Sequence, residues 1–142
     1  MTRILLLAAL LATGTVRADE PDFWTRVKLS IEQHLGRPYA WGATGMKSFD
    51  CSGFVWRVFA ESGVLFKRTT TRKLWVGLAV PPKGGETAFG NLVFFDNLRH
   101  VGIVNDRTSF YHAQTSVGTN LCTMTPFWRG KVVGVRAGPA PE

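Results

Sequence analysis

The chain has 142 residues, of which 45% are hydrophobic, 19% are charged and 12% are aromatic, and its formal net charge is +7. This length predicts a single domain, and the composition excludes a disordered, collagen-like or coiled-coil protein. The two cysteines cannot form a disulfide scaffold, and they lack the spacing of a zinc site.

Residues 1–18 are predicted to be a secretory signal peptide. Arg3 gives a positive start, and residues 4–12 form an apolar run that is shorter than the roughly 20 residues needed to span a bilayer. Residues 16–18 fit a signal cleavage site, whereas the alternative is a short buried N-terminal helix. Cleavage would leave residues 19–142 as an exported domain, periplasmic or extracellular, with no membrane insertion.

The positive charge is dispersed along the chain, without a run of five Lys or Arg residues. A solvated surface explains most of these charges. Nucleic acid, an anionic membrane surface and an anionic polymer are the partners that a basic protein attracts. Export makes nucleic acid the least expected of the three, and we expect no nucleic-acid partner.

The first half of the chain predicts two helices separated by a glycine-containing loop over residues 37–49. Asp22 is the expected N-cap of the first helix, which should end at Gly36. An apolar residue at every fourth position marks its buried face: Phe23, Val27, Ile31 and Leu35. His34 lies off this face and is expected to be solvated. Residues 52–62 predict the second helix.

The second half of the chain is typical of strands, because Val, Ile, Phe and Tyr recur in short runs between turn residues. Residues 64–90 are mixed and carry Pro and Gly breaks. The predicted strands cover residues 92–95, 101–105, 109–114 and 132–136, with residues 121–125 as a possible fifth. Helices followed by strands predict an α+β fold with an antiparallel sheet.

Cys51 lies where the glycine-containing loop enters the second helix, in Asp50-Cys51-Ser52-Gly53. The positive end of a helix and a nearby imidazolium both lower the pKa of a thiol, so this position favours a nucleophile. Gly53 is expected to leave room for a substrate to approach. The alternative is a buried structural cysteine.

Two histidines fall on consecutive predicted strands. If the hairpin is centred on Asp106, His100 lies opposite His112 with the Cβ atoms about 5 Å apart. One imidazole can then act as a base for the thiol, while the other fixes its tautomer and orientation. The alternatives are two unrelated surface histidines or a metal pair. Because no third ligand has suitable spacing, we expect neither metal nor cofactor.

Several segments resemble the NlpC/p-sixty family of bacterial cell-wall cysteine peptidases, and the resemblance covers nearly all of residues 19–142. DCSGFV, at residues 50–55, is similar to the family's nucleophile motif. The other similar segments are GRPYAWG at 36–42, GNLVFF at 90–95, HVGIV at 100–104, YHA at 111–113 and residues 128–136. The sequence departs from the family pattern at Ala43, Lys67 and Asn91, which puts substrate preference in doubt more than activity.

This resemblance implies a papain-like α+β fold, with N-terminal helices packed on a central antiparallel sheet, and a Cys-His-His triad. By position, Cys51 is the nucleophile, His100 is the general base and later acid, and His112 orients His100. Tyr39 and the Cys51 amide would donate hydrogen bonds to the oxyanion. The family hydrolyses peptidoglycan stem peptides, most often between D-glutamate and a diamino acid such as meso-diaminopimelate.

The resemblance also suggests that Asp50 and Ser52 contact the stem peptide and that Trp41 forms a wall of the groove. Each has a structural alternative, since Asp50 and Ser52 can cap a helix and Trp41 can belong to the core. Arg68 could pair with a substrate carboxylate, but we expect an exposed structural arginine. Cys122 is expected to be a packed thiol on or near a strand.

The predicted function is that of an exported, monomeric cysteine peptidase that hydrolyses peptidoglycan stem peptides. One alternative is another acyl transfer on the same fold, such as an amidase or transpeptidase reaction. The other is a non-catalytic module that binds the cell wall or inhibits a partner through the same groove.

Overall fold

The computed structural model describes residues 20–43, 45, 47–78, 80–82 and 84–141, so the predicted signal peptide lies outside the described residues. The longer helices are α1 (Phe23–Gln33), α2 (Cys51–Glu61) and α3 (Thr71–Gly77). The strands are β1 (Leu92–Phe95), β2 (His100–Asp106), β3 (Ser109–Gln114), β4 (Gly118–Thr123) and β5 (Val132–Arg136). Two short helices, η1 (Asp96–Leu98) and α4 (Pro126–Arg129), follow β1 and β4. Within the described ranges, no helix has the length and hydrophobicity needed to cross a membrane.

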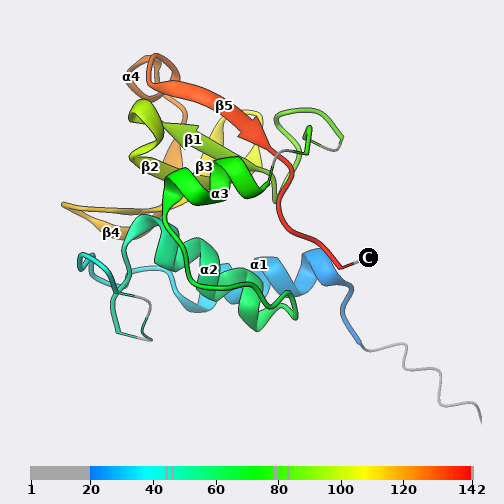
Figure 1. Ribbon diagram of the computed structural model, residues 1–142. Helices are drawn as coiled ribbons and strands as arrows, with labels where there is room; N and C mark the ends of the chain where they lie inside the picture. Colours follow the sequence, from blue (N-terminus) through cyan, green and yellow to red (C-terminus); the bar gives the residue numbers. More distant parts are fainter. Residues whose placement is uncertain (1–19, 44, 46, 79, 83, 142) are drawn as a thin grey trace, which may run out of the picture.

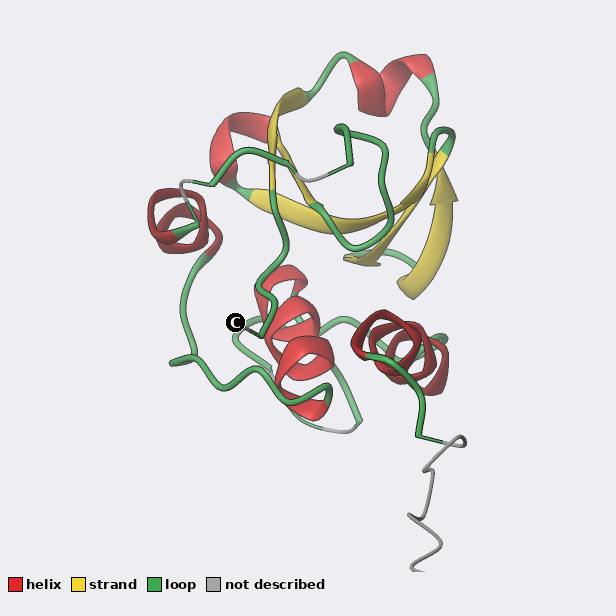
Figure 2. Cartoon of the chain, turned by 90° about the vertical axis from the view of Figure 1, so that its right-hand side faces the viewer, coloured by secondary structure: helices red, strands yellow, loops and turns green. Residues whose placement is uncertain are grey.

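The five strands form one antiparallel sheet in the order β4-β3-β2-β1-β5. Helices α1 and α2 lie side by side beneath one face of the curved sheet, and α4 lies on the opposite side (Figures 1 and 2). This arrangement confirms the predicted α+β class, in which helices packed on a sheet bury a common core.

The sheet separates two apolar clusters. The larger one lies between the sheet and the helices and includes Val27, Ile31, Phe54, Val58 and Phe59, all of them fully buried. The smaller one lies on the other face, where partly buried Trp128 of α4 packs against four side chains: Val93, Phe95, Val104 and Phe110. Because side chains alternate along a strand, His112 shares this second face with Phe110.

The first helix was predicted correctly at its start, where Asp22 accepts a hydrogen bond from the Thr25 amide at 2.8 Å. Two expectations at its end were wrong. Leu35 lies beyond the helix and is 37% exposed, whereas His34 is only 1% exposed. The buried His34 ring packs edge-on against Phe49, and its Nε2 lies 2.8 Å from Oε1 of Glu61, partners that the periodicity of one helix cannot reveal.

Residues 64–90 contain a helix that the sequence pattern did not predict. Helix α3 begins after Thr70, whose hydroxyl accepts a hydrogen bond from the Lys73 amide at 3.3 Å. The helix buries only Thr71 and Leu74, so its apolar pattern is too short to show a period. The fifth strand exists, but it covers Gly118–Thr123 rather than 121–125.

Strands β2 and β3 form the hairpin that carries both histidines, in a different register from the one expected. His100 does not pair with His112; Ile103 pairs with Tyr111, two residues from the expected alignment, and a bulge precedes Asp106. The apolar pattern specifies the face of a strand, whereas the turn and its bulge set the register. A displacement by two residues keeps every side chain on its expected face.

Candidate active site

Asp50 fixes the start of α2 and therefore the position of the proposed nucleophile. Its Oδ1 accepts a hydrogen bond from the Gly53 amide at 2.6 Å, and its Oδ2 accepts one from the Gly42 amide at 2.9 Å. The Asp50 amide donates to the Ala43 carbonyl at 3.0 Å. One carboxylate thus joins the preceding loop to the helix, so the alternative considered for Asp50, a helix N-cap, is what the structure shows.

Gly53 is needed for the close contact between the preceding loop and α2, and not for the approach of a substrate. A Cβ atom on Gly53 would lie 2.8 Å from Oδ1 of Asp50 and would also collide with the Ala43 carbonyl. The expectation that Gly53 leaves room for a substrate was therefore wrong, because the loop itself occupies that space. Glycine is required here by the close approach of two backbone segments.

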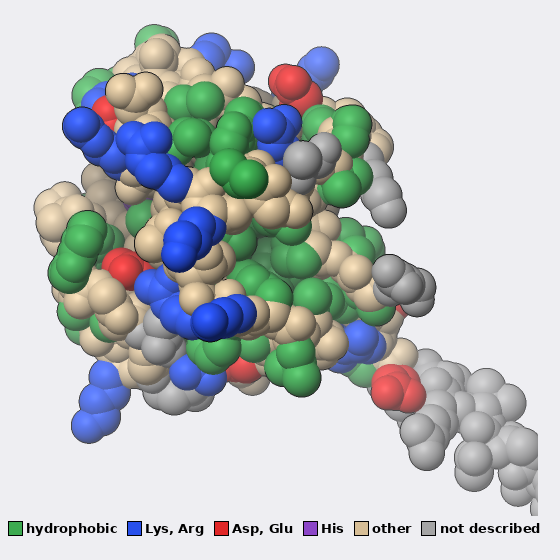
Figure 3. Space-filling model, in the orientation of Figure 1, with side chains coloured by type: hydrophobic (Ala, Val, Ile, Leu, Met, Phe, Trp, Pro, Cys, Tyr) green, Lys and Arg blue, Asp and Glu red, His purple; other side chains and the backbone are tan. Residues whose placement is uncertain are grey.

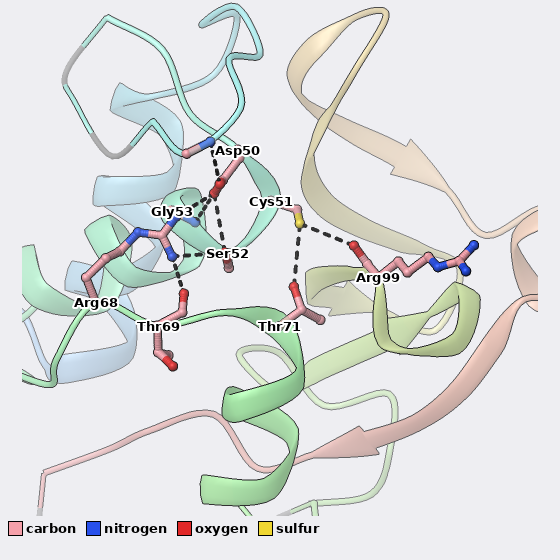
Figure 4. A network of polar contacts seen from close by, with 9 residues as sticks. Asp50, Cys51, Ser52, Gly53, Arg68, Thr69, Thr71 and Arg99 are labelled. Carbon is pink, nitrogen blue, oxygen red and sulfur yellow. Dashed lines mark hydrogen bonds and ion pairs between the residues drawn. The ribbon is translucent and has the colours of Figure 1, made fainter.

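Arg68 holds the Asp50 carboxylate from the far side, across 18 residues of sequence. Its Nη2 lies 2.8 Å from Oδ1 of Asp50, and its Nη1 donates to the Ser52 hydroxyl at 3.0 Å and to the Thr69 carbonyl (Figure 4). The Ser52 hydroxyl in turn donates to Asp50 at 3.3 Å. Arg68 is thus structural, as expected, but it is part of the site instead of a freely exposed residue.

The Cys51 thiol is only 8% exposed. Its Sγ lies 3.6 Å from the Thr71 hydroxyl and 3.8 Å from the Arg99 carbonyl, and both groups face the sulfur in Figure 4. Burial raises the pKa of Cys51, despite the hydrogen bond from Thr71, which lowers it. The expectation of a lowered pKa was therefore wrong for the unliganded site, because desolvation of the thiolate outweighs the favourable groups around it.

His100 and His112 are in direct contact, although they are not paired across the strands. Nε2 of His100 lies 2.7 Å from Nδ1 of His112, and the rings are nearly perpendicular. Burial lowers the pKa of His100 to about 4 and that of His112 to about 3, with the neighbouring His100 also lowering the latter. Both imidazoles are consequently neutral at pH 7.

The contact between the rings limits the tautomers that allow catalysis. If Nδ1 of His100 is to accept the thiol proton, Nε2 of His100 must carry a hydrogen and donate it to His112. His112 then carries its own hydrogen on Nε2, an atom that is buried without a hydrogen-bond partner in the described part of the chain. His100 directly follows Arg99, whose carbonyl contacts the thiol, so the strand that begins with His100 starts beside the sulfur.

A cavity of about 770 Å³ opens beside the thiol. It brings together all the residues of the first two motifs that were expected near the substrate: Tyr39, Trp41, Asp50, Cys51 and Ser52. Trp41 is 90% exposed, so the alternative that it belongs to the core is wrong. Burial, then the charges of Cys51 and Asp50, raise the pKa of Tyr39, which keeps its phenol protonated as a hydrogen-bond donor.

The opposite wall of the cavity was not predicted. It consists of residues from the start of α3 and the turn before β2: Thr69, Thr70, Thr71, Arg72, Lys73, Leu98 and Arg99. These segments lack periodic apolar residues, and only the fold brings them to Cys51. The hydroxyl of Thr71, in contact with the sulfur, had no sequence signal at all.

The remaining residues singled out from the sequence lie away from the thiol. Asn91 is 3% exposed and donates a hydrogen bond to the Gly85 carbonyl at 2.8 Å, so it ties down a loop. Cys122 packs against the smaller cluster from β4, as expected, and both cysteines are free. In the described ranges, no three His, Cys, Asp or Glu side chains are placed to hold a metal ion.

Comparison with known proteins identifies the family. The model of the NlpC/P60 family matches residues 36–137, and the chain belongs to this family. Probable endopeptidase p60 of Listeria seeligeri is 40% identical over 86 residues, which cover 58% of this chain and only 16% of that relative. The chain thus spans a small part of the length of the Listeria relatives it matches.

Another relative is similar over more of its own length. The Escherichia coli K12 protein named murein DD-endopeptidase MepS/murein LD-carboxypeptidase is 37% identical over 131 residues, which cover 82% of this chain and 69% of that protein. The chain therefore belongs to a family of peptidoglycan hydrolases.

Solved structures share the fold at low sequence identity. An NLP/P60 family protein of Staphylococcus aureus similar to a lipoprotein superposes with a TM-score of 0.69 at 23% identity, covering 86% of this chain and 43% of that one. The peptidoglycan hydrolase RipB of Mycobacterium tuberculosis gives a TM-score of 0.60 at 22% identity, covering 84% and 68%. These likenesses support the papain-like architecture of the family.

Proposed function

We propose that the protein is an exported cysteine peptidase that hydrolyses peptidoglycan stem peptides between D-glutamate and the diamino acid, with Cys51, His100 and His112 as its triad. The observation that carries this proposal is the position of Cys51: it is the first residue of α2, it lines a cavity, and it contacts the carbonyl of Arg99, just before the strand that begins with His100. Family membership supports peptidoglycan as the substrate.

In the proposed mechanism, the thiol gives its proton to Nδ1 of His100 as the sulfur attacks the scissile carbonyl. His112 keeps His100 in the competent tautomer by accepting the hydrogen bond from Nε2. As the first residue of α2, Cys51 has an amide without an acceptor inside the helix, so this amide and the Tyr39 hydroxyl stabilise the oxyanion. His100 then protonates the leaving amine, and water hydrolyses the thioester.

The resting site favours proton transfer during attack over a preformed thiolate–imidazolium pair. Burial raises the pKa of Cys51 and lowers that of His100 to about 4, so both groups are neutral before substrate binds. A substrate carbonyl next to the sulfur supplies the electrophile that makes the transfer productive. The same neutral state argues that the thiol reacts slowly with small alkylating reagents in the absence of substrate.

A second candidate for the scissile bond comes from the Escherichia coli relative, which is named a murein DD-endopeptidase and LD-carboxypeptidase. Cleavage next to D-alanine would use the same thiol and imidazoles. The two candidates differ only in which stem-peptide segment occupies the cavity of Cys51.

Defined muropeptides resolve the two bonds. Residues 19–142 would be incubated with an uncrosslinked tripeptide stem, a tetrapeptide stem and a crosslinked dimer, and the products identified by mass spectrometry. Cleavage of the tripeptide after D-glutamate supports the first bond, whereas cleavage of the crosslink or release of D-alanine supports the second. Cys51→Ala is the control and should abolish turnover. Intact substrates in every incubation would favour the non-catalytic module.

A further inference from the structure

The cavity beside Cys51 has an uneven charge distribution. Among the described residues that line it, Arg68, Arg72, Lys73 and Arg99 are cationic, and Asp50 is the only acid. Lys and Arg side chains gather on the face of the molecule that carries the start of α3 (Figure 3). The cavity therefore has an excess of positive charge next to the proposed nucleophile.

The one acid of the cavity cannot balance this excess. Asp50 already binds Arg68 at 2.8 Å and two backbone amides, so its charge is neutralised within the site. Arg72, Lys73 and Arg99 are exposed, and none of them forms an ion pair with a described carboxylate. Their cationic groups remain available to a ligand.

Arg72 and Lys73 are contributed by α3, and Arg99 by the turn that follows η1, so the three charges come from two separate segments that both line the cavity. In Figure 4, the Thr71 hydroxyl and the Arg99 carbonyl face the sulfur of Cys51 from these two segments, whereas the Arg99 guanidinium extends away from the sulfur. A carboxylate bound by these exposed side chains would therefore lie beside the sulfur and not at it.

We infer that Arg72, Lys73 and Arg99 form a subsite for a free carboxylate of the substrate, and that the protein selects stem peptides whose carboxylates are not amidated. This inference rests on the proposed function and names its specificity. Guanidinium groups match the planar geometry of a carboxylate and bind it with two hydrogen bonds. An amide at the same place is neutral and has a donor facing the cations, so both the charge attraction and the hydrogen-bond match are lost.

The test measures binding separately from turnover. In a Cys51→Ala background, calorimetry would compare the free tripeptide stem with two analogues, one amidated on D-glutamate and one on the diamino acid. We expect one of the two amidated analogues to bind about tenfold more weakly than the free stem, which is the effect of losing a charge-assisted hydrogen bond. The triple substitution R72Q/K73Q/R99Q should bring the ratio of the affinities close to one.

Arg107→Gln is the matched control, because Arg107 is exposed at the β2–β3 turn and lies outside the cavity lining. This control should retain the preference for the free carboxylate. Equal binding of all three peptides by the parent protein, or an unchanged preference in the triple variant, would overturn the subsite. Loss of the preference in Arg107→Gln as well would also overturn it, since the effect would then come from net charge. Because binding is measured without catalysis, failure of the proposed hydrolysis in the muropeptide experiment is a separate result.

Discussion

The indole of Trp128 stacks on the imidazole of His100, with the ring centroids 5.7 Å apart and the planes inclined by 30°. The same indole meets His112 edge-on at 5.1 Å. One side chain from α4 therefore covers both members of the histidine pair. Because burial is the main cause of their lowered pKa values, Trp128 contributes to keeping both rings neutral.

Replacing Trp128 with Ala should change the pH dependence of the reaction. In the wild type, kcat/KM should fall on the acid side with the pKa of His100, about 4, because a protonated His100 cannot accept the thiol proton. Trp128→Ala should expose His100 and therefore move the acid limb of the profile toward pH 6.5, the ordinary pKa of a histidine. A pH–rate profile checks this shift. Trp24→Ala, which opens a distant aromatic contact with Phe89, should leave the limb in place.

The neutral histidines should also make folding stability depend on pH. The unfolded chain binds a proton at His100 below pH 6.5, whereas the folded chain does so only near pH 4. Stability is therefore complete above pH 6.5 and falls as the pH is lowered to about 4, by about 3 kcal/mol for this one group. Urea unfolding at pH 7 and pH 4.5 measures the loss. His100→Phe should reduce the difference between the two pH values; an unchanged difference would contradict the assignment.

Arg68→Gln should weaken both the fold and the reaction. The substitution leaves the Asp50 carboxylate without its ion pair at 2.8 Å and the Ser52 hydroxyl without a donor. We expect the free energy of unfolding to fall by about 1–3 kcal/mol. We also expect kcat to fall, since the start of α2 is held less firmly. Chemical denaturation and single-turnover kinetics measure the two effects. Arg68→Lys should restore part of the stability, and Arg107→Gln should affect neither.

Gly53→Ala tests the close approach of the loop to α2. A Cβ atom at this position would displace the Asp50 carboxylate and the Ala43 carbonyl, so we expect a loss of about 1–3 kcal/mol in stability. Gly45→Ala is the matched control, because a Cβ atom on Gly45 meets nothing within 4 Å. Thermal unfolding of the two variants should separate them clearly. Equal melting temperatures would contradict this prediction, because they would show that the loop can move aside without a loss of stability.

The sequence was sufficient for the parts of the site that are local in the chain. Asp50, Cys51 and Ser52 are consecutive, and the rules for helix N-termini predict the geometry that a carboxylate cap gives them. The fold class followed in the same way from the change of apolar period at Leu92. These predictions needed no knowledge of which segments meet in space.

The rest of the site depends on contacts between distant segments. Thr71 and Arg99 reach the sulfur from segments without a periodic pattern, and His34 is buried beside a glutamate on another helix. The register of the β2–β3 hairpin, which carries both histidines, depends on a bulge that the sequence of the two strands does not predict. The raised pKa of Cys51 likewise follows from burial, which is a property of the assembled core.

The buried, uncharged state of the sulfur at rest affects how the protein endures its surroundings. A thiol with a raised pKa has little thiolate at pH 7, and the thiolate is the form that attacks peroxides and foreign disulfides and is oxidised by them. An exported protein, as we propose this one to be, meets these oxidants without the cytosolic systems that repair them. Because Cys51 is a buried, neutral thiol between turnovers, we expect it to oxidise slowly, and we expect its reactivity to rise only when a peptide occupies the cavity.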